Sequence, residues 1–270
     1  MRFGIGRRAV AAVLAWSAIS PAAMPQEAPE ATHMREELGL NPHTTPEIRS
    51  VLEDLETLGI PKKDLFRQEV ANSGFSNRVQ LAMCFGGLIA DGFLMVASQD
   101  SEGIQELGPA LIRQARTLAI GEKITRRSSS LTDLAKRGQW KAFEAELLAM
   151  QADVESALIE LRDEQLIHLI SLGGWLRGLE VVCEVVLIDY SEARAAILIR
   201  PEEPVYFLDR LETLHPSLRG TALIRQVEDS VRGISRIESN LGTQPPDRET
   251  VEEIRALSIK ANRAITGQKR

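Results

Sequence analysis

Aromatic residues are scarce in this sequence, and so are the clusters of residues that form β-strands. Only 4% of the 270 residues are Phe, Trp or Tyr. Runs of Val, Ile, Thr and Tyr bounded by turn residues are rare, whereas Ala, Leu, Glu, Arg and Gln recur in nearly every segment. The composition therefore argues against a β-sandwich or a β-barrel.

The chain also lacks an excess of basic charge. Its 32 Lys and Arg residues face 38 Asp and Glu residues, which gives a formal net charge of −6. Such a chain has no electrostatic footprint for the polyanionic backbone of DNA or RNA. We expect no nucleic-acid partner.

Common catalytic and metal-binding motifs are missing too. We find no Gly-x-Ser-x-Gly elbow, no phosphate loop, no His-Glu-x-x-His and no Cys-x-x-Cys. The four histidines are scattered, at His33, His43, His168 and His215. We therefore expect no cofactor and no metal, and we name no catalytic residue. An enzymatic role is left open, with a non-catalytic role favoured.

The first 22 residues have the layout of a secretory signal peptide. A start with three arginines precedes an apolar run over 9–19, and the small residues Ser20 and Ala22 follow it. The run is too short to anchor the chain in a bilayer. Cleavage after Ala22 is our prediction, with cleavage after Ala23 as the near alternative and twin-arginine export through Arg7-Arg8 as another route. The mature chain would be periplasmic or secreted.

The rest of the chain divides into a leader and a helical domain. Removal of the three arginines in 1–22 changes the net charge from −6 to −9. Residues 23–45 mix Pro, Glu, Ala and Thr with little periodicity, which predicts a flexible leader. Apolar residues then recur at helical spacing through 46–270. We predict a single all-α domain, a multi-helix bundle of about nine helices around two central glycine-rich apolar helices.

These two helices are expected over 78–98 and 166–188. Each holds small residues one turn apart, which lets two helix backbones approach closely. The pairs are Gly86 with Ala90 and Gly174 with Gly178. We predict that the helices cross at these four residues. The partial match between their glycine patterns also leaves open an old duplication of a helical hairpin.

A membrane-spanning role is the alternative for these segments. Residues 79–98 carry the single charge of Asp91 and are long enough to span a bilayer. Asp91 near the centre would oppose insertion by about 2.5 to 3.5 kcal/mol. The companion segment carries four polar side chains, His168, Arg177, Glu180 and Glu184. We expect buried core helices, and a mature chain that is not embedded in a membrane.

A candidate polar cluster lies in these apolar segments, and it comprises Asp91, Arg177, Glu180 and Glu184. The spacing of 3 and 4 residues from Arg177 to Glu184 places the last three on one helix face. One interpretation is a structural network of ion pairs inside the core. The other is a polar pocket for a ligand, a cation or an acid/base pair.

The two cysteines allow a disulfide if the glycine helices run antiparallel. Export leads to an oxidising compartment, and an antiparallel crossing would bring Cys84 and Cys183 within about one helical turn along the axis. A parallel arrangement would separate them. The alternative is two buried free thiols.

The functional hypothesis is an exported helical scaffold or binding protein of the bacterial envelope, with an unknown protein or small molecule as partner. Its motivation is the absence of every common catalytic motif. The alternative is a small-ligand carrier or an uncommon enzyme with a polar pocket at the crossing of the two glycine-rich helices. An open cavity at Asp91, Arg177 and Glu180 would favour the alternative, whereas full burial and mutual pairing would favour the scaffold.

Overall fold

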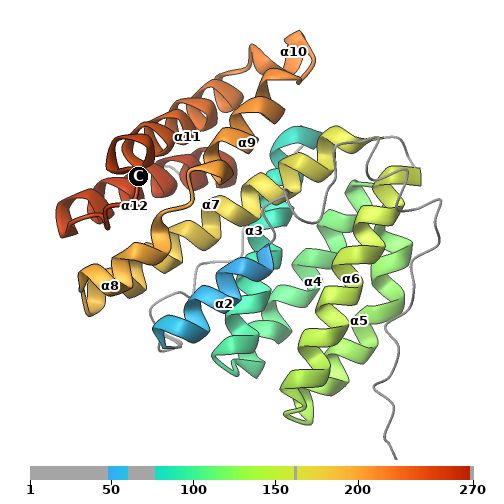
Figure 1. Cartoon of the computed structure of the whole chain (residues 1–270). Coiled ribbons are helices and arrows are strands. Elements are labelled where there is room, and N and C mark those ends of the chain that lie inside the picture. Colours follow the sequence, from blue (N-terminus) through green and yellow to red (C-terminus); the bar gives the residue numbers. More distant parts are fainter. Residues whose placement is uncertain (1–47, 60–76, 161–162, 268–270) are drawn as a thin grey trace, which may run out of the picture. The chain divides into compact units, whose positions relative to one another are not determined.

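The computed structural model describes residues 48–59, 77–160 and 163–267, and in these ranges all regular secondary structure is helical (Figure 1). The all-α prediction is confirmed. Nine of the α-helices in these ranges have at least 11 residues. The predicted signal peptide (1–22) and leader (23–45) lie outside the described residues.

The elements follow one another with short connections. In chain order they are α2 (Ile48–Leu58), α3 (Arg78–Ala97), α4 (Ser101–Thr117), α5 (Gly121–Lys136), α6 (Trp140–Glu160), α7 (Glu164–Ile188), α8 (Glu192–Ala195), the 3₁₀ helix η2 (Ala196–Leu198), α9 (Glu202–Glu212), α10 (Pro216–Arg219), α11 (Ala222–Leu241) and α12 (Arg248–Thr266).

Side-chain caps define where several helices begin. Asn77 accepts a hydrogen bond of 2.9 Å from the backbone N–H of Val79 at the start of α3. Asp247 accepts one of 2.8 Å from Thr250 at the start of α12. Each cap satisfies a backbone donor that has no partner within its own helix.

Helix α7 packs most extensively against α3, α12 and α2, and less extensively against α6 and α9 (Figure 1). Helices α3 and α7 are both long and apolar enough to cross a membrane, but 78% and 89% of their apolar windows are buried inside the protein. The buried residues include the large side chains Phe85, Phe93 and Leu176. The apolar surface of each helix is thus covered by other helices of the same chain.

Helices α4, α5 and α6 lie between α3 and α7 in the sequence. Each packs on the one before it, beginning with α4 on α3. Arg127 of α5 contributes to this packing, because its Nε donates to Asp153 of α6 at 2.6 Å and its Nη1 to Glu146 at 3.2 Å. The chain thus makes three helical passes before α7 returns to pack against α3.

Candidate functional site

Helices α3 and α7 touch through their backbones at Gly86 and Gly173. A Cβ atom placed on Gly86 would overlap the carbonyl oxygen of Ile170 and lie 2.9 Å from the backbone nitrogen of Gly174. A Cβ atom on Gly173 would overlap the carbonyl oxygen of Met83. Only glycine allows this separation, because any side chain would force the helices apart.

The predicted crossing residues lie in this contact region or beside it. Gly86 and Gly174 are in direct proximity. Ala90 and Gly178, one turn farther along, are buried. Gly173, which is not among the four predicted crossing residues, provides one of the two closest contacts. Periodicity identified the helix face but could not say which of two adjacent glycines meets the opposing backbone.

The two helices run parallel, which differs from the antiparallel crossing that a disulfide would need. Gly173 lies against Met83, and Arg177 reaches Asp91 farther along, so residue numbers rise together along both helices. Position 84 is then level with about position 172. Cys183 is therefore about 16 Å farther along the axis than Cys84.

Both cysteines are free and buried. Gln114 of α4 donates a hydrogen bond of 3.6 Å to Sγ of Cys84. Burial raises the pKa of both thiols, and Cys183 is shifted far more strongly. A thiol held in its neutral form is a poor nucleophile. The arrangement corresponds to the alternative of two buried thiols.

Three members of the candidate polar cluster meet inside the fold. Arg177 donates from Nε to Oδ1 of Asp91 at 2.7 Å and from Nη1 to Oε1 of Glu180 at 3.2 Å. The side chain of Arg177 is only 5% exposed. Asn262 of α12 donates to Oε2 of Glu180 at 2.6 Å and to the carbonyl oxygen of Leu176 at 3.1 Å. The network therefore joins α3, α7 and α12.

Electrostatics inside this network favour a charged guanidinium. Burial opposes ionisation of Arg177, but Asp91 and Glu180 outweigh it and raise the pKa of the guanidinium. Burial also raises the pKa of Asp91, and the positive charge of Arg177 opposes that rise. Each charge of the trio therefore has a partner of opposite sign within the network.

Glu184, the fourth predicted member, belongs to a different contact. Its carboxylate pairs with Arg255 of α12, one helical turn beyond Glu180. Both side chains are about one-third exposed. The structure thus separates a largely buried trio from a pair about one-third exposed on the same side of α7.

A second ionic cluster, which the sequence analysis missed, lies where α2, α7, α9 and α11 meet. We call it the Arg200 cluster, and it comprises Asp54, Trp175, Arg200, Glu203 and Glu238. The guanidinium of Arg200 pairs with Asp54 and, at 3.5 Å, with Oε1 of Glu203. Trp175 donates its indole N–H to Oε2 of Glu203 at 2.6 Å. The backbone N–H of Arg200 donates to Glu238 at 3.3 Å.

The sequence did contain a signal for this cluster. Glu238 falls on the apolar stripe of α11, at helical spacing from Val231 and Ile234. Asp54 lies next to Leu55 and one turn before Leu58, on the inward side of α2. A charged residue on an apolar helix face is unusual enough to mark a buried ionic contact.

The Arg200 cluster borders a small pocket whose lining also includes Leu179, Val182, Ile197 and Leu198. It has room for about one water molecule. A second pocket, between α7 and α9, is smaller still. Asp91, Arg177 and Glu180 line neither pocket.

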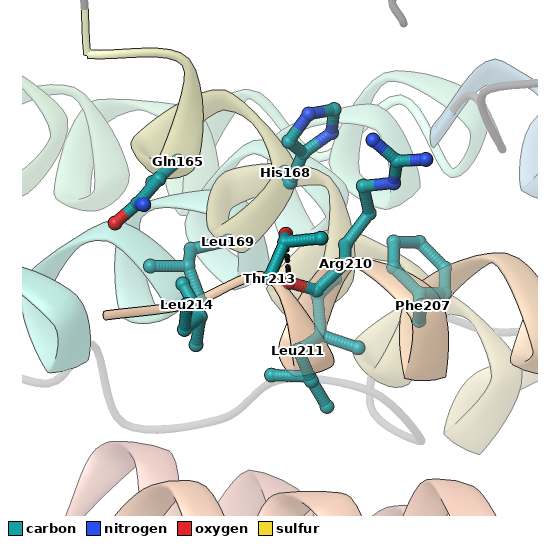
Figure 2. A pocket seen from close by; sticks show the side chains of 9 residues that line it. Gln165, His168, Leu169, Phe207, Arg210, Leu211, Thr213 and Leu214 are labelled. Atoms are coloured by element: carbon teal, nitrogen blue, oxygen red, sulfur yellow. Dashed lines mark hydrogen bonds between the residues drawn. The ribbon is translucent and has the colours of Figure 1, made fainter. Parts of the chain in front are cut away.

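His168 of α7 and Arg210 of α9 line the second pocket (Figure 2). His168 Nδ1 and the hydroxyl of Tyr206 are hydrogen-bonded at 2.8 Å, and Arg210 lies 5.5 Å from the centre of the Tyr206 ring. Burial lowers the pKa of His168 to about 4, with a smaller contribution from Arg210. The imidazole is therefore neutral at pH 7 and takes part in packing between the helices.

Within the described ranges no group of three or more His, Cys, Asp or Glu side chains is arranged to hold a metal ion. The comparisons with known proteins identify no relative: no protein-family model matches the chain, and neither the curated proteins nor the solved structures include a significant match.

Proposed function

We propose that this protein is a non-catalytic helical scaffold or binding module, exported to the periplasm or secreted. The observation that carries the proposal is the pairing of Arg177 with Asp91 and Glu180, which involves the very charges that the sequence singled out for a possible site. The side chain of Arg177 is 5% exposed and lies between two carboxylates. In this proposal its role is to hold α3 and α7 together inside the fold.

Neither of the two pockets described above is large enough to enclose a small organic ligand. Sites for small organic ligands usually enclose about 300 to 1,000 Å³. Each pocket beside α7 and α9 accommodates about one water molecule, and neither reaches the buried trio. A ligand carrier of the kind considered above would require an opening at Asp91, Arg177 and Glu180.

Export is the second part of the proposal, and it rests on the sequence of residues 1–22. The burial of α3 and α7 is compatible with it, because both apolar helices then serve as core of a water-soluble mature chain. In this proposal the partner is a protein or a small molecule that binds the surface, and neither nucleic acid nor a membrane interior is involved.

One experiment tests both parts. The chain is produced in a bacterium from its own first residue, recovered from the periplasm or medium, and examined by native mass spectrometry. We expect a polypeptide beginning at Ala23 or Met24 that carries no retained small molecule. The same spectrum gives the number of chains per particle.

Two controls make the result decisive. Leu14→Arg interrupts the predicted apolar run and should leave the chain in the cytoplasm with Met1 or Arg2 at its start. An unaltered chain that keeps Met1 and resists carbonate extraction from membranes would contradict export. A retained compound of defined mass that is lost in Arg177→Met would contradict the scaffold and support the carrier.

A further inference from the structure

The Arg200 cluster contains three carboxyl groups and one guanidinium in a largely buried setting. Asp54 is 7% exposed and Glu238 is 2% exposed. The side chain of Glu203 is 15% exposed. Three ionised carboxylates beside one cation would leave two uncompensated negative charges in a poorly solvated region, which is strongly unfavourable.

The three carboxyl groups do not share the guanidinium equally. Asp54 and Glu203 are both paired with the side chain of Arg200. Glu238 accepts from the backbone N–H of the same residue, at 3.3 Å. An amide dipole stabilises a carboxylate less than a full positive charge does. Glu238 is therefore the member for which ionisation is least compensated.

The other ionisable groups around Glu238 do not supply the missing positive charge. From α9, Glu202 and Glu203 both add negative charge, and from α2 Asp54 faces the same pocket. From α7 the buried thiol of Cys183 is close enough for the charge of Glu238 to act on it.

Two other neighbours of α11, α10 and α12, each provide an arginine that is already paired. Arg219 of α10 pairs with Glu228 at the other end of α11. Arg255 acts on the Cys183 thiol, but its guanidinium forms the contact with Glu184. Arg200 is thus the cation that faces Glu238 most directly.

We propose that the Arg200 cluster is a proton-dependent latch. With a proton on Glu238, α11 is held against the segment before α9 and, through Arg200, against α2. Loss of that proton strengthens the hydrogen bond from the Arg200 backbone N–H, but it places a second excess negative charge in the cluster. Repulsion from Glu203 and Glu202 then outweighs the stronger hydrogen bond and loosens the contact. A chain exported from the cytoplasm, as proposed above, would meet pH changes that the cytoplasm buffers, although the latch itself does not depend on export.

The acid–base properties of the cluster agree with its geometry. Burial raises the pKa of Glu238 to about 8, with Glu203 and Glu202 adding to the rise and Arg200 opposing it. Burial raises the pKa of Asp54 to about 6 against the effect of Arg200, and it raises that of Glu203 as well.

Trp175 is a built-in reporter of the latch, because its indole N–H is bonded to Glu203 and its ring packs on Phe207 at 5.0 Å between centres. In the full chain carrying Trp16→Phe and Trp140→Phe, Trp175 is the remaining tryptophan. We expect its emission to shift to longer wavelength as pH rises from 6 to 9, with a midpoint near 8 and with unchanged helical circular dichroism.

Two further substitutions are compared in that background. Glu238→Gln keeps the shape of the side chain and removes its titration, so the emission shift should disappear. Glu253→Gln makes the same change at an exposed position of α12 and should leave the shift intact. An identical transition in Glu238→Gln, or no transition with Glu238 present, would overturn the proposal.

A measurement on the chain with no substitution makes the test independent of how the variants fold. Carbon-13 chemical shifts of the glutamate carboxyl groups follow the proton on Glu238 directly. A midpoint well above the ordinary glutamate value of 4.5 supports the latch. A midpoint at or below that value would exclude it.

Discussion

Arg177 and Asp91 form an ion pair of 2.7 Å that connects α7 to α3 one turn beyond their glycine contact. The two residues are 86 positions apart in the sequence. Its guanidinium also binds Glu180, whose other oxygen accepts from Asn262. One side chain thus links the two apolar helices and, through Glu180, the C-terminal helix.

Replacement of Arg177 by Met should destabilise the protein strongly. It leaves two largely buried carboxylates without their cation, and breaking a buried pair in this way typically lowers the free energy of unfolding by about 3 to 5 kcal/mol. Urea denaturation followed by circular dichroism measures the loss. Arg255→Met is the matched control, because its pair with Glu184 is about one-third exposed and should contribute about 1 kcal/mol or less.

The triple variant Asp91→Leu, Arg177→Met, Glu180→Leu separates pairing from packing. Apolar replacement of a complete buried network is often neutral or stabilising. We expect the triple variant to be more stable than Arg177→Met alone. If Arg177→Met lowered the free energy of unfolding by less than about 1 kcal/mol, the network would not be what holds α3 and α7 together.

Two adjacent glycines of α3 should respond in opposite ways to alanine. At Gly86 the added Cβ meets the backbone of Ile170, and overpacking should lower the free energy of unfolding by about 1 to 3 kcal/mol or more. At Gly87 the nearest atoms are 3.9 and 4.0 Å from the added Cβ, which is ordinary contact. Gly87→Ala should be neutral or stabilising by up to about 1 kcal/mol, because alanine favours the helix.

Melting temperatures of the two variants decide the matter. Equal melting temperatures, or a greater loss at Gly87, would mean that the backbones do not meet at Gly86. Gly173→Ala should resemble Gly86→Ala, since it meets the carbonyl oxygen of Met83.

Stability should decrease as pH rises from 6.5 to 8. The pKa of Glu238 is raised from 4.5 to about 8 in the folded chain, so folding favours the protonated form and stability is lost as pH rises between these values. Asp54 acts in the same sense between 3.8 and about 6. His168 acts in the opposite sense, because its pKa is lowered from 6.5 to about 4 and stability is lost as pH falls through that range.

Above pH 6.5 the contribution of Glu238 is therefore separated from those of Asp54 and His168. The free energy of unfolding should fall by at most about 1.4 kcal/mol per pH unit in this window. Denaturant titrations at pH 6.5 and 8 measure the slope. In Glu238→Gln the slope should flatten, and a slope that persists would assign the pH dependence to other groups.

Both thiols should be present and unreactive in the folded protein. Cys84 and Cys183 are buried and lie about 16 Å apart along the parallel pair of helices. We expect a thiol reagent to modify neither cysteine in native buffer and two per chain after denaturation without reductant. No free thiol in the denatured chain, with a monomeric band on a non-reducing gel, would contradict the parallel arrangement.

Helical periodicity predicted amphipathic helices such as α11 because each buries one face, and the spacing of apolar residues reports that face directly. Helices α3 and α7 are buried on most sides and were predicted from the length of their apolar runs. The direction of α7 relative to α3 was predictable too. Three helices lie between them, and helices that alternate in direction across short turns bring the fifth back parallel to the first. The disulfide that the sequence left open required the opposite direction, which this count of helices argues against.

The Arg200 cluster could not be assembled from the sequence, although its members could be noticed. Asp54, Trp175, Arg200 and Glu238 come from four separate parts of the chain. Periodicity says that Asp54 and Glu238 point inward, but not that they point toward the same arginine. Arg177 and Glu180 were easier to pair, because a spacing of three residues on one helix already places them together.

The contact between Gly86 and Gly173 also bears on how the chain folds. Synthesis proceeds from the N-terminus, so α3 is complete long before α7 exists. Helices α4, α5 and α6 can pair locally in the meantime, whereas the central contact requires closing a loop of more than 80 residues. Until then α3 exposes a surface that α7 later covers, and a nascent chain stopped before α7 will depend on chaperones to avoid aggregation.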